Sequence, residues 1–163
     1  MNRFKTFIAI TVLVATICVG CTTDDDGSSD DNTVQIQEVQ STVQDGTWRI
    51  TNFNDSGQDE TSDFTGYNFT FASDGTLTAS NGTDSLTGTW SVMDDSSSSS
   101  DDDDSSSDDD DVDFNIFFPV PDSNDFEDLN DDWDIVSISA TRIELIDVSG
   151  GNGGTDRLTF EKN

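Results

Sequence analysis

Short segments in which apolar and polar residues alternate are the feature that most restricts how this chain can fold. In residues 64–71 (FTGYNFTF) the residues Tyr67, Phe69 and Phe71 fall on one side of an extended backbone. The same two-residue period recurs at residues 85–92, 112–116, 136–140, 143–145 and 158–160, and less regularly at 47–53. Successive side chains of a strand point to opposite faces, so this period predicts half-buried strands. We therefore expect an all-β fold.

Turn sequences separate the predicted strands. Asp74-Gly75 and Asn81-Gly82 predict two-residue hairpin loops, because Gly and Asn tolerate positive φ. Residues 140–142 predict a tight connection, and residues 149–155 (SGGNGGT) predict a loose glycine loop. These connections join each strand to the next one along the chain, which is the order of an antiparallel meander.

Residues 119–132 interrupt the strand pattern. Within them, Asp122 or Ser123 is a suitable N-cap for one short helix, and Phe126 and Leu129 are then placed to close an end of the barrel. The whole pattern predicts an up-and-down antiparallel barrel of about eight strands with one short helix.

Acidic residues dominate the composition. The 163 residues include 35 acids, 6 bases and no histidine. Arg3 and Lys5 precede every acidic residue. From Cys21 onward the chain therefore has 4 basic and 35 acidic residues, a net charge of −31. This charge repels nucleic acid and anionic headgroups, and we exclude nucleic-acid binding. Triads that need histidine and imidazole metal sites are also excluded. We expect no catalytic residues and no enzymatic activity.

The segment 94–111 (DDSSSSSDDDDSSSDDDD) contains only aspartate and serine. It has no apolar side chain whose burial offsets the entropy of ordering, so we expect a disordered loop that interrupts a single domain over residues 45–163. Its carboxylates are expected to attract Ca²⁺ diffusely. Neither Asp24–Gly27 nor residues 122–132 has the ligand spacing of a calcium-binding loop, so no specific metal site is predicted.

The first 20 residues have the pattern of a secretory signal peptide. A basic start is followed by the uncharged segment 7–19, which is shorter than the roughly 20 residues of a membrane-spanning helix. An uncleaved anchor is the alternative. Cys18 and Cys21 have C-x-x-C spacing, but an apolar leader without further ligands disfavours a metal or redox site.

Residues 18–21 (CVGC) resemble a bacterial lipobox, which implies cleavage after Gly20 and lipidation of Cys21. Asp24–Asp26 resemble the export signal of Bacteroidota surface lipoproteins, with a merely solvated spacer as the alternative. The resemblance implies acyl chains, palmitate among them, in the outer membrane and display on the cell surface. We expect residues 21–44 to form a flexible acidic tether, although Val34, Ile36, Val39 and Val43 allow a short helix or strand.

Gly46-Thr47-Trp48 is similar to the Gly-x-Trp signature of lipocalins, and Gly88-Thr89-Trp90 repeats it. The chain thus resembles the lipocalin-like domain of small bacterial lipoproteins over residues 45–163. The resemblance implies that Trp48 closes one end of the barrel under Arg157, with cation–π stacking between them. It also implies an interior pocket for a small apolar ligand, with these candidate lining residues: Tyr67, Phe69, Phe71, Leu86, Trp90, Phe114, Ile116 and Ile138.

Two functions remain open at this stage. The first is a surface lipoprotein, expected to be monomeric, whose barrel binds a small hydrophobic or amphipathic ligand. The second is a structural or adhesive surface lipoprotein with a solid barrel and an acidic loop that attracts cations. The packing of the barrel interior separates them, because side chains at native density leave no room for a ligand.

Overall fold

The structure is a computed structural model that describes residues 29–94, 112–148 and 154–163, with only the backbone for 29–32. The predicted signal peptide, Cys21, residues 95–111 and most of the glycine loop lie outside these ranges.

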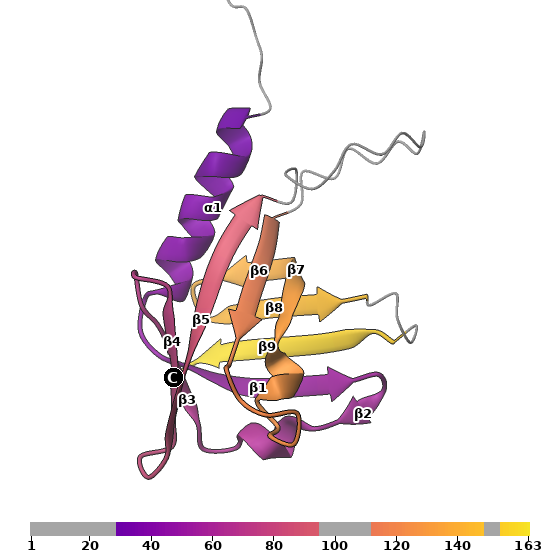
Figure 1. Cartoon of the computed structure of the whole chain (residues 1–163). Helices are drawn as coiled ribbons and strands as arrows, with labels where there is room; N and C mark the ends of the chain where they lie inside the picture. The colour runs from indigo at the N-terminus through magenta and orange to yellow at the C-terminus, as the bar shows by residue number, and fades with distance from the viewer. Residues whose placement is uncertain (1–28, 95–111, 149–153) are drawn as a thin grey trace, which may run out of the picture.

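Eight antiparallel strands close into a barrel in up-and-down order, which confirms the predicted fold class (Figure 1). A ninth strand of two residues, β2, pairs with the end of β1. The helix and strands are α1 (Ser29–Val43), β1 (Trp48–Asp55), β2 (Gln58–Asp59), β3 (Asn68–Phe71), β4 (Thr76–Ser80), β5 (Ser85–Asp94), β6 (Val112–Phe117), β7 (Asp131–Ser139), β8 (Arg142–Asp147) and β9 (Asp156–Lys162), with the 3₁₀ turns η1 (Thr61–Phe64) and η3 (Glu127–Leu129).

Strand β1 closes the barrel through unequal pairings on its two sides. It pairs with β9 from Trp48↔Lys162 to Asn54↔Arg157, with a register shift between Ile50 and Asn52. On its other side it meets β3 only at Trp48↔Phe69. The long β1–β9 ladder therefore holds the first and last strands together.

Both predicted hairpins are present, but their loops are longer than the expected two residues. Residues 72–75 connect β3 to β4, and residues 81–84 connect β4 to β5. Gly75 and Gly82 have the expected positive φ values of 81° and 87°. The Asn81 side chain accepts hydrogen bonds from the backbone N–H groups of Thr83 and Asp84, which stabilises the wider loop.

A β-bulge in β7 changes one predicted face. Val136, Ile138 and Ala140 were expected to point inward together, but the register with β8 shifts between Ile135 and Ser137. The extra residue turns the strand, so Val136 is 59% exposed while Ile138 is partly buried.

Helix α1 replaces the flexible tether over Ser29–Val43 and is the short helix that the apolar residues of this segment allowed. Val39 and Val43 lie four residues apart on one face of the helix, and both are buried against the rest of the core. Burial of these two side chains stabilises a helix that has only a weak amphipathic pattern in the sequence. Among the described residues, no helix is both long and apolar enough to cross a membrane.

The segment between β6 and β7 contains the predicted helical turn, shortened to the 3₁₀ turn η3. Phe126 and Leu129 are buried, as expected. The predicted cap is wrong, because Phe126 is the N-cap residue and its own N–H donates to Asn124 Oδ1 at 3.0 Å. The amide of Asn130 bonds the backbone N–H and C=O of Phe118, which fixes the turn against β6.

Candidate functional site

The barrel interior is filled by aromatic side chains. Phe71 on β3 contacts Phe114 on β6 and Phe160 on β9, with ring centroids 5.7 and 5.6 Å apart. Phe69 contacts Phe160 at 5.3 Å, edge to face. These rings come from strands that are not neighbours, at the separations of packed aromatic pairs. The side chains therefore meet across the interior.

The predicted pocket residues belong to this core. Five of them are buried: Phe69, Phe71, Trp90, Phe114 and Ile116. The other three are partly buried and pack against the same core: Tyr67, Leu86 and Ile138. The sequence correctly indicated that these side chains point toward the core.

All three tryptophans have a partner for the indole N–H. Trp90 donates to the carbonyl of Ala72 at 2.9 Å, and Trp133 donates to that of Leu129 at 3.2 Å. Trp48 donates to the last helical carbonyl, that of Val43, at 2.8 Å. Each tryptophan therefore packs its ring in the core and also connects a strand to the segment that covers it.

The predicted Trp48–Arg157 pair is wrong, because Lys162 takes the place of Arg157. Lys162 Nζ lies 5.8 Å from the centroid of the Trp48 ring and 2.6 Å from Asp45 Oδ2. The ladder places Lys162 opposite Trp48, whereas Arg157 lies opposite Asn54 and is exposed. Lys162 lies two residues beyond the buried Phe160, so the two-residue period was a usable signal for it.

The backbone conformation explains why glycine occupies position 46 of the Gly-x-Trp signature. Its φ is +90°, a value that L side chains rarely adopt, and a Cβ there would lie 2.9 Å from Lys162 Cε. Glycine lets the chain turn from α1 into β1 while Lys162 crosses over Trp48.

A groove of about 360 Å³ lies on the outer face of β1, β7, β8 and β9. We call it the arginine groove, after Arg142 and Arg157 in its walls. Thr159 also lines the groove and is only 6% exposed, although neighbouring outward positions of β9 are open to solvent.

Most of the positive charge near the arginine groove is already neutralised. Arg142 pairs with Glu144 at 2.7 Å and with Glu161 at 3.0 Å, and Glu161 also pairs with Arg49 at 3.3 Å. The hydrogen bond from Ser137, and then the bond from Arg142, hold the pKa of Glu144 below its usual value. Within the described ranges Arg157 has no carboxylate at ion-pair distance, so the groove presents one uncompensated guanidinium.

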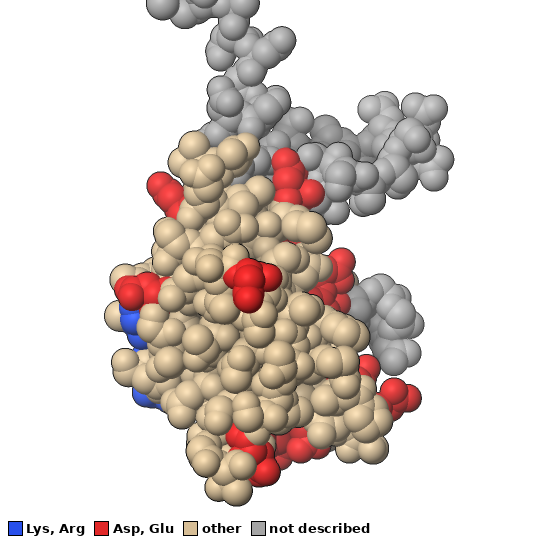
Figure 2. All heavy atoms as spheres, turned by 60° about the vertical axis from the view of Figure 1, so that its left-hand side comes forward, with Lys and Arg blue, Asp and Glu red and all other residues tan. Residues whose placement is uncertain are grey.

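The outer face of β3, β4 and β5 has a different character. We call it the hydroxyl face and define it by its outward-pointing residues Thr70, Thr76, Thr78, Thr87, Thr89 and Ser91. They lie in register, since Thr78 pairs with both Thr70 and Thr87. Most of the side turned forward in Figure 2 is formed by uncharged residues, with one acidic group near its centre and other charged groups toward its edges.

A hollow of about 160 Å³ lies where the hydroxyl face meets β6. Thr89, Ser91, Asn115 and Phe117 line it, and the Phe117 side chain is 54% exposed. Asn115 Nδ2 is buried and has no acceptor among the described residues. This hollow was missed in the sequence, although the period in 112–117 places Phe117 on the polar face with Asp113 and Asn115.

Acidic side chains gather at the end of the barrel that carries η1 and η3. Burial, followed by repulsion from Asp55 and nearby acids, raises the pKa of Glu60. Burial and the neighbouring Glu127 raise the pKa of Asp128. In the part of the chain that the structure describes, no three such residues are arranged to hold a metal ion.

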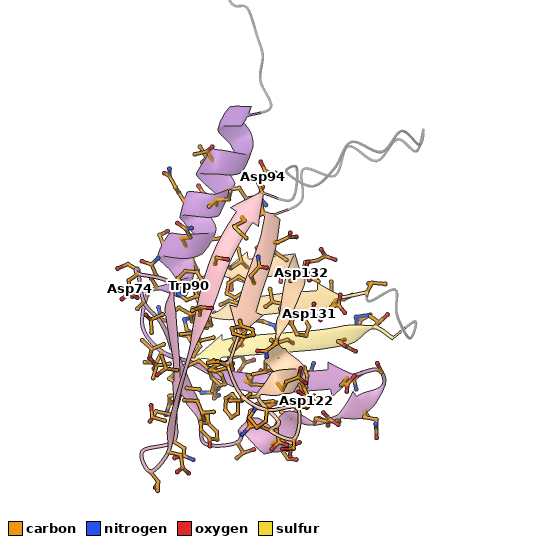
Figure 3. The ribbon with its side chains drawn as sticks, in the orientation of Figure 1. Asp74, Trp90, Asp94, Asp122, Asp131 and Asp132 are labelled. Atoms are coloured by element: carbon orange, nitrogen blue, oxygen red, sulfur yellow. The ribbon has the colours of Figure 1, made fainter. Side chains whose placement is uncertain are left out.

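Asp131 is the most perturbed carboxyl of the described residues. It begins β7 on the inward side, next to Asp132 (Figure 3). Its Oδ1 accepts a hydrogen bond from the backbone N–H of Asp132 at 2.9 Å. Burial, followed by the contact with Asp132, raises the pKa of Asp131 to about 6. Asp147 adds repulsion from β8.

This shift predicts a pH dependence of stability. A raised folded-state pKa means that the folded chain binds the proton more tightly than the unfolded chain. The contribution of Asp131 to stability is therefore full below pH 3.8 and is lost as the pH rises through about 6. Asp131→Asn should raise the urea midpoint at pH 7 and flatten its change between pH 4 and 7.

Asp74→Ala is the control with the opposite sign. Thr76 holds the pKa of Asp74 below its usual value, first through its side chain and then through its backbone N–H, which lies 3.0 Å from Asp74 Oδ1. Removing this carboxylate should lower the midpoint at pH 7. An unchanged pH profile in Asp131→Asn would assign the dependence to other carboxyls.

The chain is similar to one solved structure. No family model matches the chain, and no curated protein matches it either. A solved structure of a DUF4847 family protein from Bacteroides vulgatus ATCC 8482 is similar at 20% sequence identity, with a TM-score of 0.44. The match covers 77% of this chain and 97% of that one. The pairing of β1 with β9 closes the sheet into a barrel.

Proposed function

We propose that this protein is a lipid-anchored, non-enzymatic surface protein with a structural or adhesive role, which recognises its partners with the outside of a solid barrel. The packing of the interior carries this proposal. Phe53, Phe69, Phe71, Phe114, Trp133 and Phe160 are each at most 1% exposed. An apolar ligand in the barrel would have to displace side chains that already bury one another, so the outer face is the better place for recognition.

The position of α1 supports attachment through the N-terminus. The helix extends away from the barrel, with its N-terminal end farthest from the strands (Figure 1). Ser29, where α1 begins, follows the proposed lipid-bearing Cys21 by eight positions in the sequence. Acyl chains on Cys21 would place this end of the molecule toward the outer membrane.

The acidic insertion leaves the barrel at this same end. Figure 3 places Asp94 at the end of β5, at the end of the molecule where α1 begins. Ten aspartates occur in residues 94–111. Anionic headgroups would repel them over a Debye length of about 8 Å at physiological salt, while divalent cations would reduce that repulsion. The sides of the barrel would remain open to partners.

Covalent attachment and a solid interior are tested together by lipid extraction. Cells are labelled with radioactive palmitate, and the purified protein is extracted with chloroform and methanol. We expect label that resists extraction in the wild type and in Cys18→Ser, and no label in Cys21→Ser. Label retained by Cys21→Ser would contradict the anchor. One extractable lipid per protein molecule would contradict the solid barrel.

A further inference from the structure

We propose that the hydroxyl face, together with the hollow at Phe117, binds a neutral glycan. This inference rests on the proposed adhesive role, to which it adds the chemical class of the partner. Three features carry it: an exposed aromatic ring, an amide donor beside that ring with no acceptor among the described residues, and strands without charged outward residues on a chain with a net charge of −29.

The exposed ring is Phe117, at the end of β6. Its backbone pairs with Thr89, so the ring stands beside the threonine side chains of the hydroxyl face. An aromatic face exposed to water is favourably covered by C–H groups. A pyranose ring presents such C–H groups on one face and hydroxyl groups around its rim. The ring of Phe117 and the surrounding hydroxyls match these two parts of a sugar.

The amide donor is Nδ2 of Asn115, two residues before Phe117. Asn115 pairs with Ser91 on one side and with Asp132 on the other, and it lines the hollow. Buried donors in folded proteins are almost always paired, and an unpaired one is costly. Nδ2 itself is closed to solvent, so the Asn115 amide would turn toward the hollow to donate to a sugar oxygen. The hydroxyl hydrogens of the sugar would bond to Thr89 and Ser91.

The charge distribution selects a neutral partner. No outward residue from Thr70 to Ser91 on β3, β4 and β5 is charged. Acids stand at two edges of this face: Asp74, whose carboxylate Thr76 bonds, lies in the β3–β4 loop, and Asp113, Asp132 and Asp134 lie on β6 and β7. These carboxylates repel uronic acids and sialic acids near the hollow, while a cationic polymer would be drawn to the acids and away from the hydroxyl face.

The composition of this face is unlike that of a protein interface. Protein interfaces depend on a desolvated centre of several apolar or aromatic residues. Among the described residues that line the hollow, Phe117 is the one large apolar side chain at an outward position; Met93, 53% exposed, lies on β5 two residues beyond Ser91. A single stacking ring with several hydroxyl and amide groups suits a polyhydroxylated ligand better.

The test uses the full lipidated protein in a polyoxyethylene detergent, which carries no sugar headgroup. The probes are neutral oligosaccharides of glucose, galactose, mannose and N-acetylglucosamine on an array, with uronic acid oligosaccharides beside them. We expect binding to at least one neutral series, with affinity that does not weaken at high salt. Phe117→Ala and Asn115→Ala should each weaken that binding by about tenfold, which corresponds to 1.4 kcal/mol. Phe117→Trp should preserve it.

Val136→Ala is the matched control, since it removes a 59% exposed apolar side chain beside the arginine groove. Its glycan binding should equal that of the wild type. Absence of binding to every neutral series, or equal binding by Phe117→Ala, would overturn the inference and leave the lipid-extraction result untouched. A wild-type dimer that Phe117→Ala converts to a monomer would assign the ring to contact with a second copy and would also overturn it.

Discussion

Phe71→Ala is expected to lower the free energy of unfolding by about 3–5 kcal/mol, the range for buried phenylalanine. Phe71 is 1% exposed, and its ring contacts Trp90, Phe114 and Phe160 at centroid distances of 5.4 to 5.7 Å. Loss of the ring removes buried apolar area and leaves a cavity, because partners from three other strands cannot all move inward. Urea denaturation at constant pH measures the change.

Phe117→Ala is the control with the same chemistry. Its side chain is 54% exposed, so we expect a change of no more than about 0.5 kcal/mol. The cavity in Phe71→Ala should in addition bind benzene, which should raise the melting temperature of that variant and leave the wild type unchanged. A loss below about 1 kcal/mol in Phe71→Ala would indicate an interior that is not close packed.

Gly88→Ala is expected to destabilise the barrel by about 3 kcal/mol, at the upper end of the range for overpacked sites. Gly88 is buried on β5, between the exposed Thr87 and Thr89. A Cβ there would lie 2.3 Å from the carbonyl oxygen of Phe117 and 2.9 Å from the ring of Phe118. The first of these atoms belongs to the backbone of the neighbouring strand, so relief requires β5 and β6 to separate.

Gly154→Ala provides the comparison, because its Cβ would meet a movable side chain. The nearest atom is Ser56 Oγ at 2.2 Å, and this hydroxyl can rotate away at the loss of a 3.3 Å contact with Asp156. We expect a loss below about 1 kcal/mol, typical of one exposed hydrogen bond. A loss in Gly88→Ala as small as the one expected for Gly154→Ala would show that β5 and β6 can move apart at little cost.

The sequence alone determined the main strands and, outside the bulged strand β7, the inward direction of their side chains. Phe69, Phe71, Phe114 and Phe160 were each placed by the two-residue period, and each is buried. This works because side-chain direction in a strand is a local property of the extended backbone. For the same reason the two-residue period of residues 112–117 places Phe117 on the polar face of its strand. The alternation therefore predicts the outward threonines of the hydroxyl face. It does not predict that β6 brings Phe117 beside them.

Only the tertiary structure decided which side chains meet. Lys162 lies over Trp48 because the β1–β9 register places it there, and no local pattern sets that register. Burial of Val39 and Val43 against the core stabilises α1. In the sequence, a few scattered apolar residues were the only sign of this helix. The filled interior likewise depends on distances between strands far apart in the chain. Periodicity specifies the direction in which a side chain points, while packing and register specify what it meets there.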